Sequence, residues 1–160
     1  MNSKNLEADE KSPTVALLEV AEAAYVATIG EDGYPDVRAM FNLRKSAQFP
    51  DLAPLFKGHD KDLALYFTTN SSSRKTRQIL NDKRATAYYA IPAEFTGLSL
   101  TGDMEVVSNP DEKRRVWQKG WELYYPGGVE DPDHTVLRMR PKRGIYYCRL
   151  ERQILDFGRR

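Results

Sequence analysis

Hydrophobic and polar residues change period several times along the chain, and each change predicts a new element. Residues 12–23 carry apolar side chains at helical spacing behind Ser12 and Pro13, a capping residue followed by a proline suited to the first turn. Residues 24–29 and 37–43 are β-prone, and Gly30 to Gly33 between them form a turn signal. The N-terminal part therefore predicts a short helix followed by a β-hairpin.

The middle of the chain predicts strands around one further helix. Residues 46–60 contain two prolines and scattered apolar side chains, which predict an irregular insertion over the surface. A strand over 63–69 leads through a serine-rich break into a helix over 74–81, with Ile79 and Leu80 expected to face inward. Two more strands are predicted over 85–91 and 98–107.

The C-terminal third begins with Asn109 and Pro110, which open a helix predicted to run to about Tyr124. Residues 136–139, 145–150 and 153–157 predict strands, with 141–144 as a turn. Because strands follow one another without the crossovers that parallel sheets need, the fold class is mainly β with marginal helices, an antiparallel barrel or sandwich. Residues 1–12 are expected to form a flexible arm, and 13–160 a single domain.

Composition narrows the classes of partner. The 24 Lys and Arg nearly balance the 23 Asp and Glu, so the chain lacks the basic excess typical of proteins that bind nucleic acid or anionic membranes. The longest apolar runs, 23–27 and 63–67, are far too short to span a bilayer, and residues 1–12 do not resemble a signal peptide. The single Cys148 excludes an intrachain disulfide, and a cytoplasmic location is expected.

The most informative segment is residues 66–75, where a strand delivers hydroxyl and cationic side chains to the first turn of a helix. These side chains are Thr68, Thr69, Ser71, Ser72, Ser73, Arg74 and Lys75. Unpaired N–H groups at a helix N-terminus favour an anion, and Arg and Lys add charge-assisted donors, as a phosphate monoester requires. A serine-capped surface helix with solvated cations explains the same pattern, and local chemistry leaves both open.

Arg38 is a second candidate for anion binding. The strand alternation places it on the face shared with Met40 and opposite Val37, Ala39 and Phe41. An arginine in mid-strand often has an anionic partner, although an arginine on the barrel exterior remains the alternative.

Taken in order, these blocks resemble the pyridoxamine 5′-phosphate oxidase-related family of FMN-binding, Greek-key split barrels. The resemblance is carried by Arg38-Ala39-Met40-Phe41, by residues 65–70, by Ser73-Arg74-Lys75, by residues 78–81 and by residues 84–89. Residues 100–107, the tryptophan-bearing helix and residues 125–133 resemble the general stress protein branch more closely than the oxidase itself. The similarity extends over about residues 13–150.

The resemblance implies a cofactor and a set of residues that hold it. Arg38, Ser73, Arg74 and Lys75 would bind the phosphate of FMN and the nearby ribityl oxygens. Ala39, Met40 and Phe41 would follow the isoalloxazine ring, and Thr68 and Thr69 would complete the pocket. The family also implies a homodimer with its flavins at the subunit interface.

Two departures from the oxidase bear on the substrate. Leu43 stands where the oxidase has a lysine that reaches toward flavin and substrate, and residues 149–152 lack the Arg-x-His pair that handles the vitamin phosphate. FMN binding is expected to survive both changes. Oxidation of pyridoxamine 5′-phosphate is not expected.

Other residues suggest no competing chemistry. His59 and His134 are not at metal-ligand spacing, so no metal site is predicted, and a turn is expected around His134. Cys148 is interpreted as a buried packing residue, and the face of Trp117 and Trp121 as core or interface. The basic C-terminal segment, 138–160, is interpreted as a solvated or dimer-facing edge.

The sequence therefore predicts a dimeric split barrel that binds FMN, acts as a flavin-dependent oxidoreductase, and has unknown catalytic residues, substrate and electron donor. A split barrel using a deazaflavin or haem is one alternative. A non-catalytic, flavin-binding stress-response module is the other.

Overall fold

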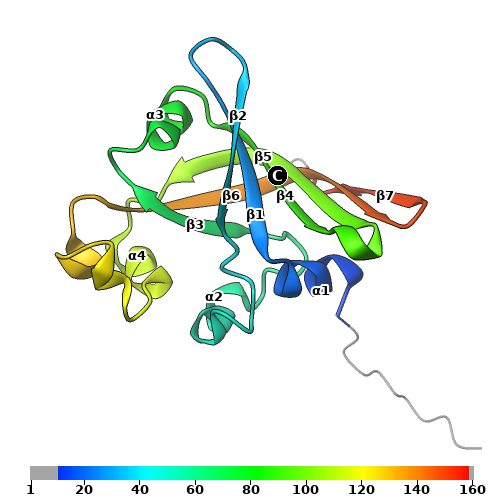
Figure 1. Ribbon diagram of the computed structural model, residues 1–160, viewed down its shortest axis with the longest axis horizontal. Coiled ribbons are helices and arrows are strands. Elements are labelled where there is room, and N and C mark those ends of the chain that lie inside the picture. Colours follow the sequence, from blue (N-terminus) through cyan, green and yellow to red (C-terminus); the bar gives the residue numbers. More distant parts are fainter. Residues whose placement is uncertain (1–10, 159–160) are drawn as a thin grey trace, which may run out of the picture.

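A computed structural model describes residues 11–158 of the protein (Figure 1). Seven strands are found in this range: β1 (Ala23–Ile29), β2 (Pro35–Phe41), β3 (Leu65–Asn70), β4 (Arg84–Ile91), β5 (Thr96–Val106), β6 (His134–Cys148) and β7 (Glu151–Asp156). The α-helices are α1 (Pro13–Val20), α2 (Ala53–Phe56), α3 (Arg74–Asn81) and α4 (Pro110–Val116). None of these helices is long and apolar enough to cross a membrane.

All strand pairs are antiparallel and belong to one sheet with the order β2-β1-β4-β5-β6-β3, to which β7 is added beside β6. The predicted antiparallel, mainly β fold class is confirmed. Strands β2 and β3 stand at the two ends of the order and do not pair with each other. The curved sheet brings these two ends to the same side of the molecule (Figure 1), so the barrel is split between β2 and β3.

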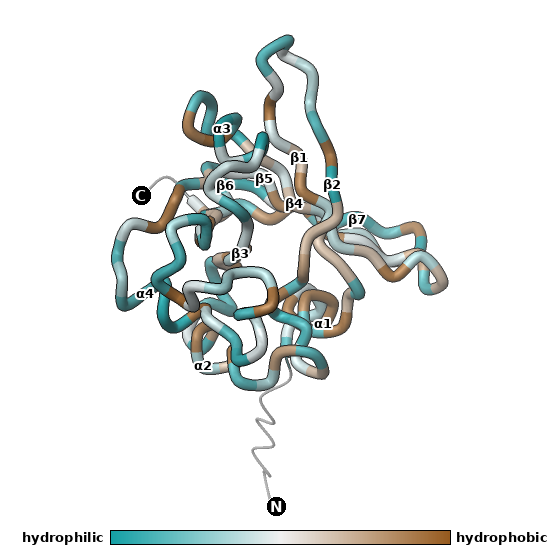
Figure 2. The backbone as a smooth tube through the Cα atoms, turned by 60° about the vertical axis from the view of Figure 1, so that its left-hand side comes forward, coloured by the Kyte–Doolittle hydropathy of each residue, from teal (hydrophilic) through white to brown (hydrophobic). Residues whose placement is uncertain are grey.

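The N-terminal elements form as their local sequence predicts. The hydroxyl of Ser12 accepts a hydrogen bond from the backbone N–H of Val15, and Pro13 occupies the first helical position of α1. Gly33 has a φ of 82°, which only glycine adopts readily, and it closes the turn between β1 and β2. The tip of this hairpin projects from the body and is hydrophilic (Figure 2). The predicted arm lies outside the described residues, except for Lys11 and Ser12.

Two separate clusters of buried apolar side chains stabilise the fold. The larger cluster fills the barrel and is closed by α1 and α3, with Leu18, Leu98, Leu100 and Met104 fully buried. The smaller cluster lies outside the barrel wall, where the segment after β2 packs against α4 and the residues that follow it. Alternation along β3 supplies both clusters, because Phe67 points into the barrel and Tyr66 into the outer cluster.

The prediction that residues 46–60 form an irregular insertion over the surface is wrong, because this segment contributes to the core. Phe49, Leu52 and Phe56 are buried in the outer cluster, and short helical turns over 50–56 hold them there. Leu80 is also misplaced by the prediction, since 70% of it is exposed while Ile79 is buried. Consecutive residues of a helix point in directions about 100° apart, so α3 directs Ile79 toward the barrel and Leu80 away from it.

The predicted turn over 141–144 is absent, because β6 continues from His134 to Cys148. Pro141 and Gly144 resemble a turn in sequence, but Pro141 lies at a register shift between β5 and β6, opposite Gly102. A proline lacks the N–H that a regular ladder uses, and a bulge tolerates that loss. The turn expected around His134 is present: the N–H of His134 donates to the carbonyl of Asp131 at 3.0 Å, and His134 is also the first residue of β6.

The helix predicted to reach Tyr124 ends at Val116. Trp117 has extended backbone angles, and Gly120 has a φ of 98°. Because the helix ends there, Trp117, Trp121 and Tyr125 can gather in one aromatic cluster, which a continuous helix would spread along its axis.

Cys148 was predicted to be buried but is half-buried, and its sulfur accepts a hydrogen bond of 3.4 Å from the hydroxyl of Thr96.

Candidate functional site

A groove of about 720 Å³ lies between the unpaired edges of β2 and β3. This volume is typical of cofactor and small-molecule sites, which measure roughly 300–1,000 Å³. Seven of the predicted site residues line it, namely Arg38, Ala39, Met40, Phe41, Thr68, Thr69 and Lys75. Each edge strand has a neighbour on only one side, so half of its N–H and C=O groups face the split and are available to a ligand.

Arg38 reaches the groove from the inward face of β2. Its Nη1 donates to the carbonyl of Val26 at 3.2 Å and to the hydroxyl of Thr28 at 2.6 Å, and its Nη2 donates to Oε1 of Gln78 at 3.2 Å. All three acceptors are neutral. The pKa of Arg38 is lowered, mainly because burial disfavours its charged form.

Lys75 faces Arg38 from the first turn of α3. Its ammonium donates to the hydroxyl of Thr69 at 2.9 Å. Burial lowers the pKa of Lys75, and the positive charge of Arg38 lowers it further. Within residues 11–158 neither cation forms a salt bridge, so two like charges are held close together without a carboxylate between them. Such an arrangement favours a bound anion, which would relieve the mutual repulsion.

The serine loop contributes less directly to the groove than its sequence suggests. Ser72 donates to the carboxylate of Asp133 through both its N–H and its hydroxyl, each at 3.0 Å, and Ser71 donates to the carbonyl of Pro132 at 2.8 Å. The hydroxyl of Ser73 accepts from the N–H of Thr76 and caps α3. The loop is therefore tied to the residues before β6, and the pKa of Asp133 is lowered, first by its hydrogen bond from Asn70.

Arg74 points away from the groove. Its guanidinium donates to Oδ2 of Asp36 at 2.8 Å and borders a neighbouring cavity of about 430 Å³. The structure thus separates Arg74 from Arg38 and Lys75, which adjoin the groove. Sequence reasoning missed Asp36, and the alternation of β2 is the signal that could have found it, because Asp36 shares the face of Arg38.

The other end of the groove is aromatic. Phe41, Trp121, Tyr124 and Tyr125 line it together with Met40. Phe49 supports this wall from behind, with ring centroids 5.8 Å from Phe41 and 6.3 Å from Trp121. The groove is therefore cationic at one end and aromatic at the other, and sequence analysis missed Tyr124 and Tyr125 as lining residues.

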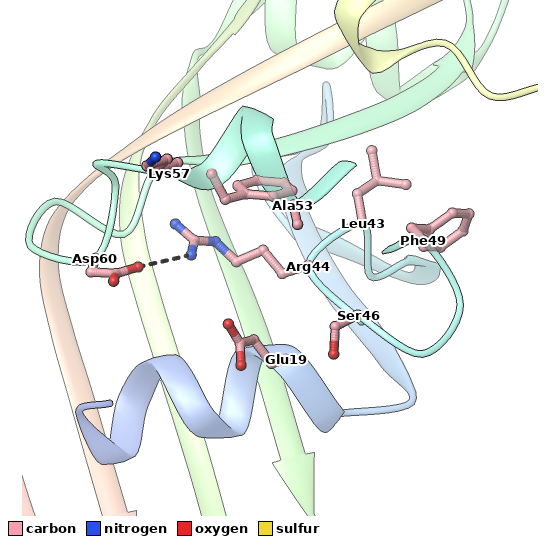
Figure 3. Close-up of a pocket in the computed structure, with 9 residues that line it drawn as sticks. Glu19, Leu43, Arg44, Ser46, Phe49, Ala53, Lys57 and Asp60 are labelled. Carbon is pink, nitrogen blue, oxygen red and sulfur yellow. Dashed lines mark ion pairs between the residues drawn. The ribbon is translucent and has the colours of Figure 1, made fainter. Parts of the chain in front are cut away.

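Leu43 lies outside this groove. It is buried in the outer cluster and borders a separate cavity of about 160 Å³ (Figure 3). Arg44 occupies that cavity and is held by the carbonyls of His59 and Ala64, each 3.0 Å from Nη2, with its guanidinium over the ring of Phe56. The cavity is built around a structural arginine that fastens the segment before β3.

His134 is buried between two aromatic rings. Its ring centroid lies 5.1 Å from that of Trp117 and 4.9 Å from that of Tyr125. Nδ1 is 3.2 Å from the carbonyl of Val129, and because a carbonyl only accepts, Nδ1 carries the proton. Nε2 has no hydrogen-bond partner in the described part of the chain. Burial accordingly lowers the pKa of His134.

This lowered pKa predicts that acid destabilises the fold. Below pH 6.5, the ordinary pKa of histidine, the unfolded chain binds the proton before the folded one does. The free energy of unfolding should therefore fall with pH through this range, by at most about 1.4 kcal/mol per pH unit for one group. Urea unfolding at pH 7.5 and 5.5 measures this dependence. We expect it to be smaller in His134→Asn and retained in the control variant His59→Asn, at a half-buried position outside the aromatic cluster. Equal dependence in all three proteins would contradict the assignment.

An antiparallel barrel opened along one side, with a cationic groove in the opening, defines the class of split-barrel proteins. The family model for pyridoxamine 5′-phosphate oxidase matches residues 13–148, so the chain belongs to that family. No curated protein matches the sequence.

Solved structures agree with this assignment. A protein related to general stress protein 26 of Bacillus subtilis, of the pyridoxinephosphate oxidase family and from Clostridium acetobutylicum, is 29% identical with a TM-score of 0.71, covering 89% of this chain and 91% of that one. General stress protein 26 of Bacillus anthracis shares the fold at 15% identity and a TM-score of 0.65, covering 88% and 93%. A haem-binding protein from Mycobacterium smegmatis also shares the fold, at 14% identity and a TM-score of 0.62, covering 91% of this chain and 59% of that one.

Proposed function

We propose that the protein binds FMN in the groove between β2 and β3 and acts as a flavin-dependent oxidoreductase in the cytoplasm. The observation that carries this proposal is the pair of half-buried cations, Arg38 and Lys75, neither of which forms a salt bridge with a carboxylate of the described residues. A phosphate monoester supplies the missing negative charge. The family to which the chain belongs makes the flavin phosphate the leading candidate.

The groove offers groups for the phosphate of FMN at its cationic end and for the isoalloxazine ring farther along. Arg38, Lys75 and the capped turn at Ser73 would hold the phosphate, and Arg74 would join them only after leaving Asp36. The edge of β2 at Ala39, Met40 and Phe41 would offer backbone groups to the polar rim of the ring, and Thr68 and Thr69 would line the opposite side. Bound flavin would supply hydride and electron transfer, whereas these residues bind and orient it.

Haem is the competing cofactor, because one protein with this fold binds it. Neither of the two histidines lines the groove: His59 pairs with Asp62, and His134 is enclosed by Trp117 and Tyr125. The histidine that commonly ligates haem iron is therefore not available at the groove. This arrangement favours a flavin.

Cofactor titration tests the proposal. We expect FMN to bind the purified protein at least tenfold more tightly than riboflavin, which lacks the phosphate, and haem to bind weakly. A deazaflavin is included because it has a similar tricyclic ring, with carbon in place of one nitrogen, and a phosphate. Equal affinity for FMN and riboflavin, or a preference for haem or the deazaflavin, would overturn the proposal.

Turnover separates the enzyme from a non-catalytic flavin-binding module. The FMN-loaded protein should oxidise NADH or NADPH when a dye acceptor is present. Pyridoxamine 5′-phosphate should not be converted, because the position of the oxidase lysine is taken by the buried Leu43 and residues 149–152 lack the Arg-x-His pair. A protein that binds FMN and shows no turnover with either nicotinamide is a binding module.

We further propose that the protein is a homodimer. The outward face of the β1–β2 hairpin exposes apolar side chains, with Tyr25 46%, Val37 64% and Phe41 48% exposed. Phe41 also lines the groove, so a subunit covering this face would close the groove as well.

Light scattering should therefore report a mass of about twice 18.3 kDa. A charge at the interface, Val37→Asp, is expected to shift the protein toward monomer. The same change at Val20, which is 57% exposed on α1, serves as the matched control and should leave the dimer intact. A monomeric parent protein that holds FMN tightly would contradict the proposed interface.

A further inference from the structure

Gln78 is a buried polar side chain of α3. It lies between Arg38, at the cationic end of the groove, and Asp36. Its Oε1 accepts from the hydroxyl of Thr28 at 2.6 Å and from Nη2 of Arg38 at 3.2 Å. Its Nε2 donates to Oδ2 of Asp36 at 2.5 Å. Only 5% of Gln78 is exposed, so water does not compete strongly for these bonds.

The neighbours of Gln78 allow only one orientation of its amide. A guanidinium only donates hydrogen bonds, and a carboxylate only accepts them. A flipped amide would place its NH₂ against Arg38 and its oxygen against Asp36, and both contacts would become repulsive. The amide therefore has a fixed direction, and its oxygen gives the Arg38 guanidinium a fixed acceptor.

Thr28 completes the same set of contacts. It is fully buried, and its hydroxyl donates to Gln78 while accepting from Nη1 of Arg38 at 2.6 Å. Both functions of the hydroxyl are thus used. Together with the carbonyl of Val26, these groups hold both Nη nitrogens of Arg38, which also lines the groove.

The amide of Gln78 also separates Arg38 from Asp36. Asp36 already accepts from Gln78 and pairs with Arg74; first the hydrogen bond from Gln78 and then the charge of Arg74 lower its pKa, so it stays ionised. A direct ion pair between Asp36 and Arg38 would cancel the charge that a phosphate needs. Because Gln78 stands between them, Asp36 forms no salt bridge with Arg38, and the hydrogen-bond acceptors of Arg38 are all neutral.

From this geometry we infer that Gln78 is a positioning residue for phosphate binding, one that aims the Arg38 guanidinium into the groove and keeps it from pairing with Asp36. The inference rests on the proposed binding of FMN and names a residue that does not itself line the groove. A purely structural role, in which Gln78 only fastens α3 to β1, is the competing explanation.

The affinity ratio between FMN and riboflavin separates these explanations. Gln78→Met keeps the length of the side chain and removes its hydrogen bonds, and we expect it to weaken FMN binding about tenfold while changing riboflavin binding less than twofold. Gln78→Glu places a carboxylate against Arg38 and should weaken FMN binding more than Gln78→Met does. Arg77→Met, at an exposed position of the same helix, is the matched control and should leave the ratio unchanged.

A second measurement needs no flavin. In the ligand-free parent, the hydrogen bonds that both Nη groups donate should slow rotation of the Arg38 guanidinium and give resolved side-chain N–H resonances by NMR. Gln78→Met should average the Nη2 signals, and Arg77→Met should not.

Equal losses of FMN and riboflavin affinity in the Gln78 variants, or an unchanged Arg38 spectrum in Gln78→Met, would overturn the inference. Binding by the parent protein is measured first. If the parent does not prefer FMN to riboflavin, both the proposed function and the inference are overturned. If the parent prefers FMN but the Gln78 variants lose affinity for both cofactors equally, the inference alone is overturned. Circular dichroism and thermal unfolding verify that each variant is folded.

Discussion

Neutralising Arg38 or Lys75 is expected to weaken FMN binding by roughly tenfold to a hundredfold for each change. Charge-assisted hydrogen bonds to phosphate contribute about 1.5–3 kcal/mol each, which corresponds to this range. Arg38→Met and Lys75→Met preserve much of the apolar length of each side chain. Isothermal titration of both variants with FMN and with riboflavin measures the effect.

Riboflavin is the internal control, because it has the same ring and no phosphate. Its affinity should stay within about twofold of the parent value in both variants. Arg74→Met should cost less FMN affinity than either, because Arg74 is held by Asp36 outside the groove. If FMN and riboflavin lose affinity in parallel, the two cations support the fold of the groove rather than the phosphate, and the assignment is wrong.

Gly102→Ala is expected to destabilise the protein by about 3 kcal/mol. A Cβ at this position would lie 2.2 Å from the carbonyl oxygen of Arg140 and 2.9 Å from Cα of Pro141, and both of these atoms belong to backbone. Neither can rotate away as a side chain does, so β5 and β6 must separate at the bulge. Leu100 and Met104, two residues on either side of Gly102 in β5, are fully buried, so the separation would disturb the barrel core.

Urea unfolding of Gly102→Ala gives the free energy directly. Gly33→Ala is the matched control, because Gly33 has a φ of 82° and nothing within 4 Å of its added Cβ. That control should cost only the conformational strain, about 1 kcal/mol. A Gly102→Ala variant no less stable than the control would show that the bulge relaxes around a methyl group.

Much of the local structure could be predicted because its causes are local. Ser12 and Pro13 begin α1, Gly33 closes a hairpin turn, and Ser73 caps α3 through interactions within four residues of each position. Alternation along β2 likewise predicts that Arg38 and Met40 share one face, whereas only the folded structure shows that this face is the inward one.

The predictions that were wrong depend on partners far away in sequence. Residues around Pro141 resemble a turn until β5 pairs with them and the proline is accommodated at a bulge. The helix after Pro110 would continue if helical spacing alone decided its length, but Trp117 and Trp121 find aromatic partners only by leaving it. Local patterns do not contain these contacts, because tertiary packing overrides them.

At the candidate site, the chemistry can be predicted from the sequence: cations and hydroxyls stand at the start of α3, an arginine lies in β2, and the order of these groups identifies the family. Their arrangement depends on contacts between distant parts of the chain. The tertiary structure brings the unpaired edges of β2 and β3 together, gives Arg38 neutral partners, and turns Arg74 toward Asp36. The physical reason is that side-chain charge is a local property, whereas its neutralisation depends on which distant groups the closed sheet places beside it.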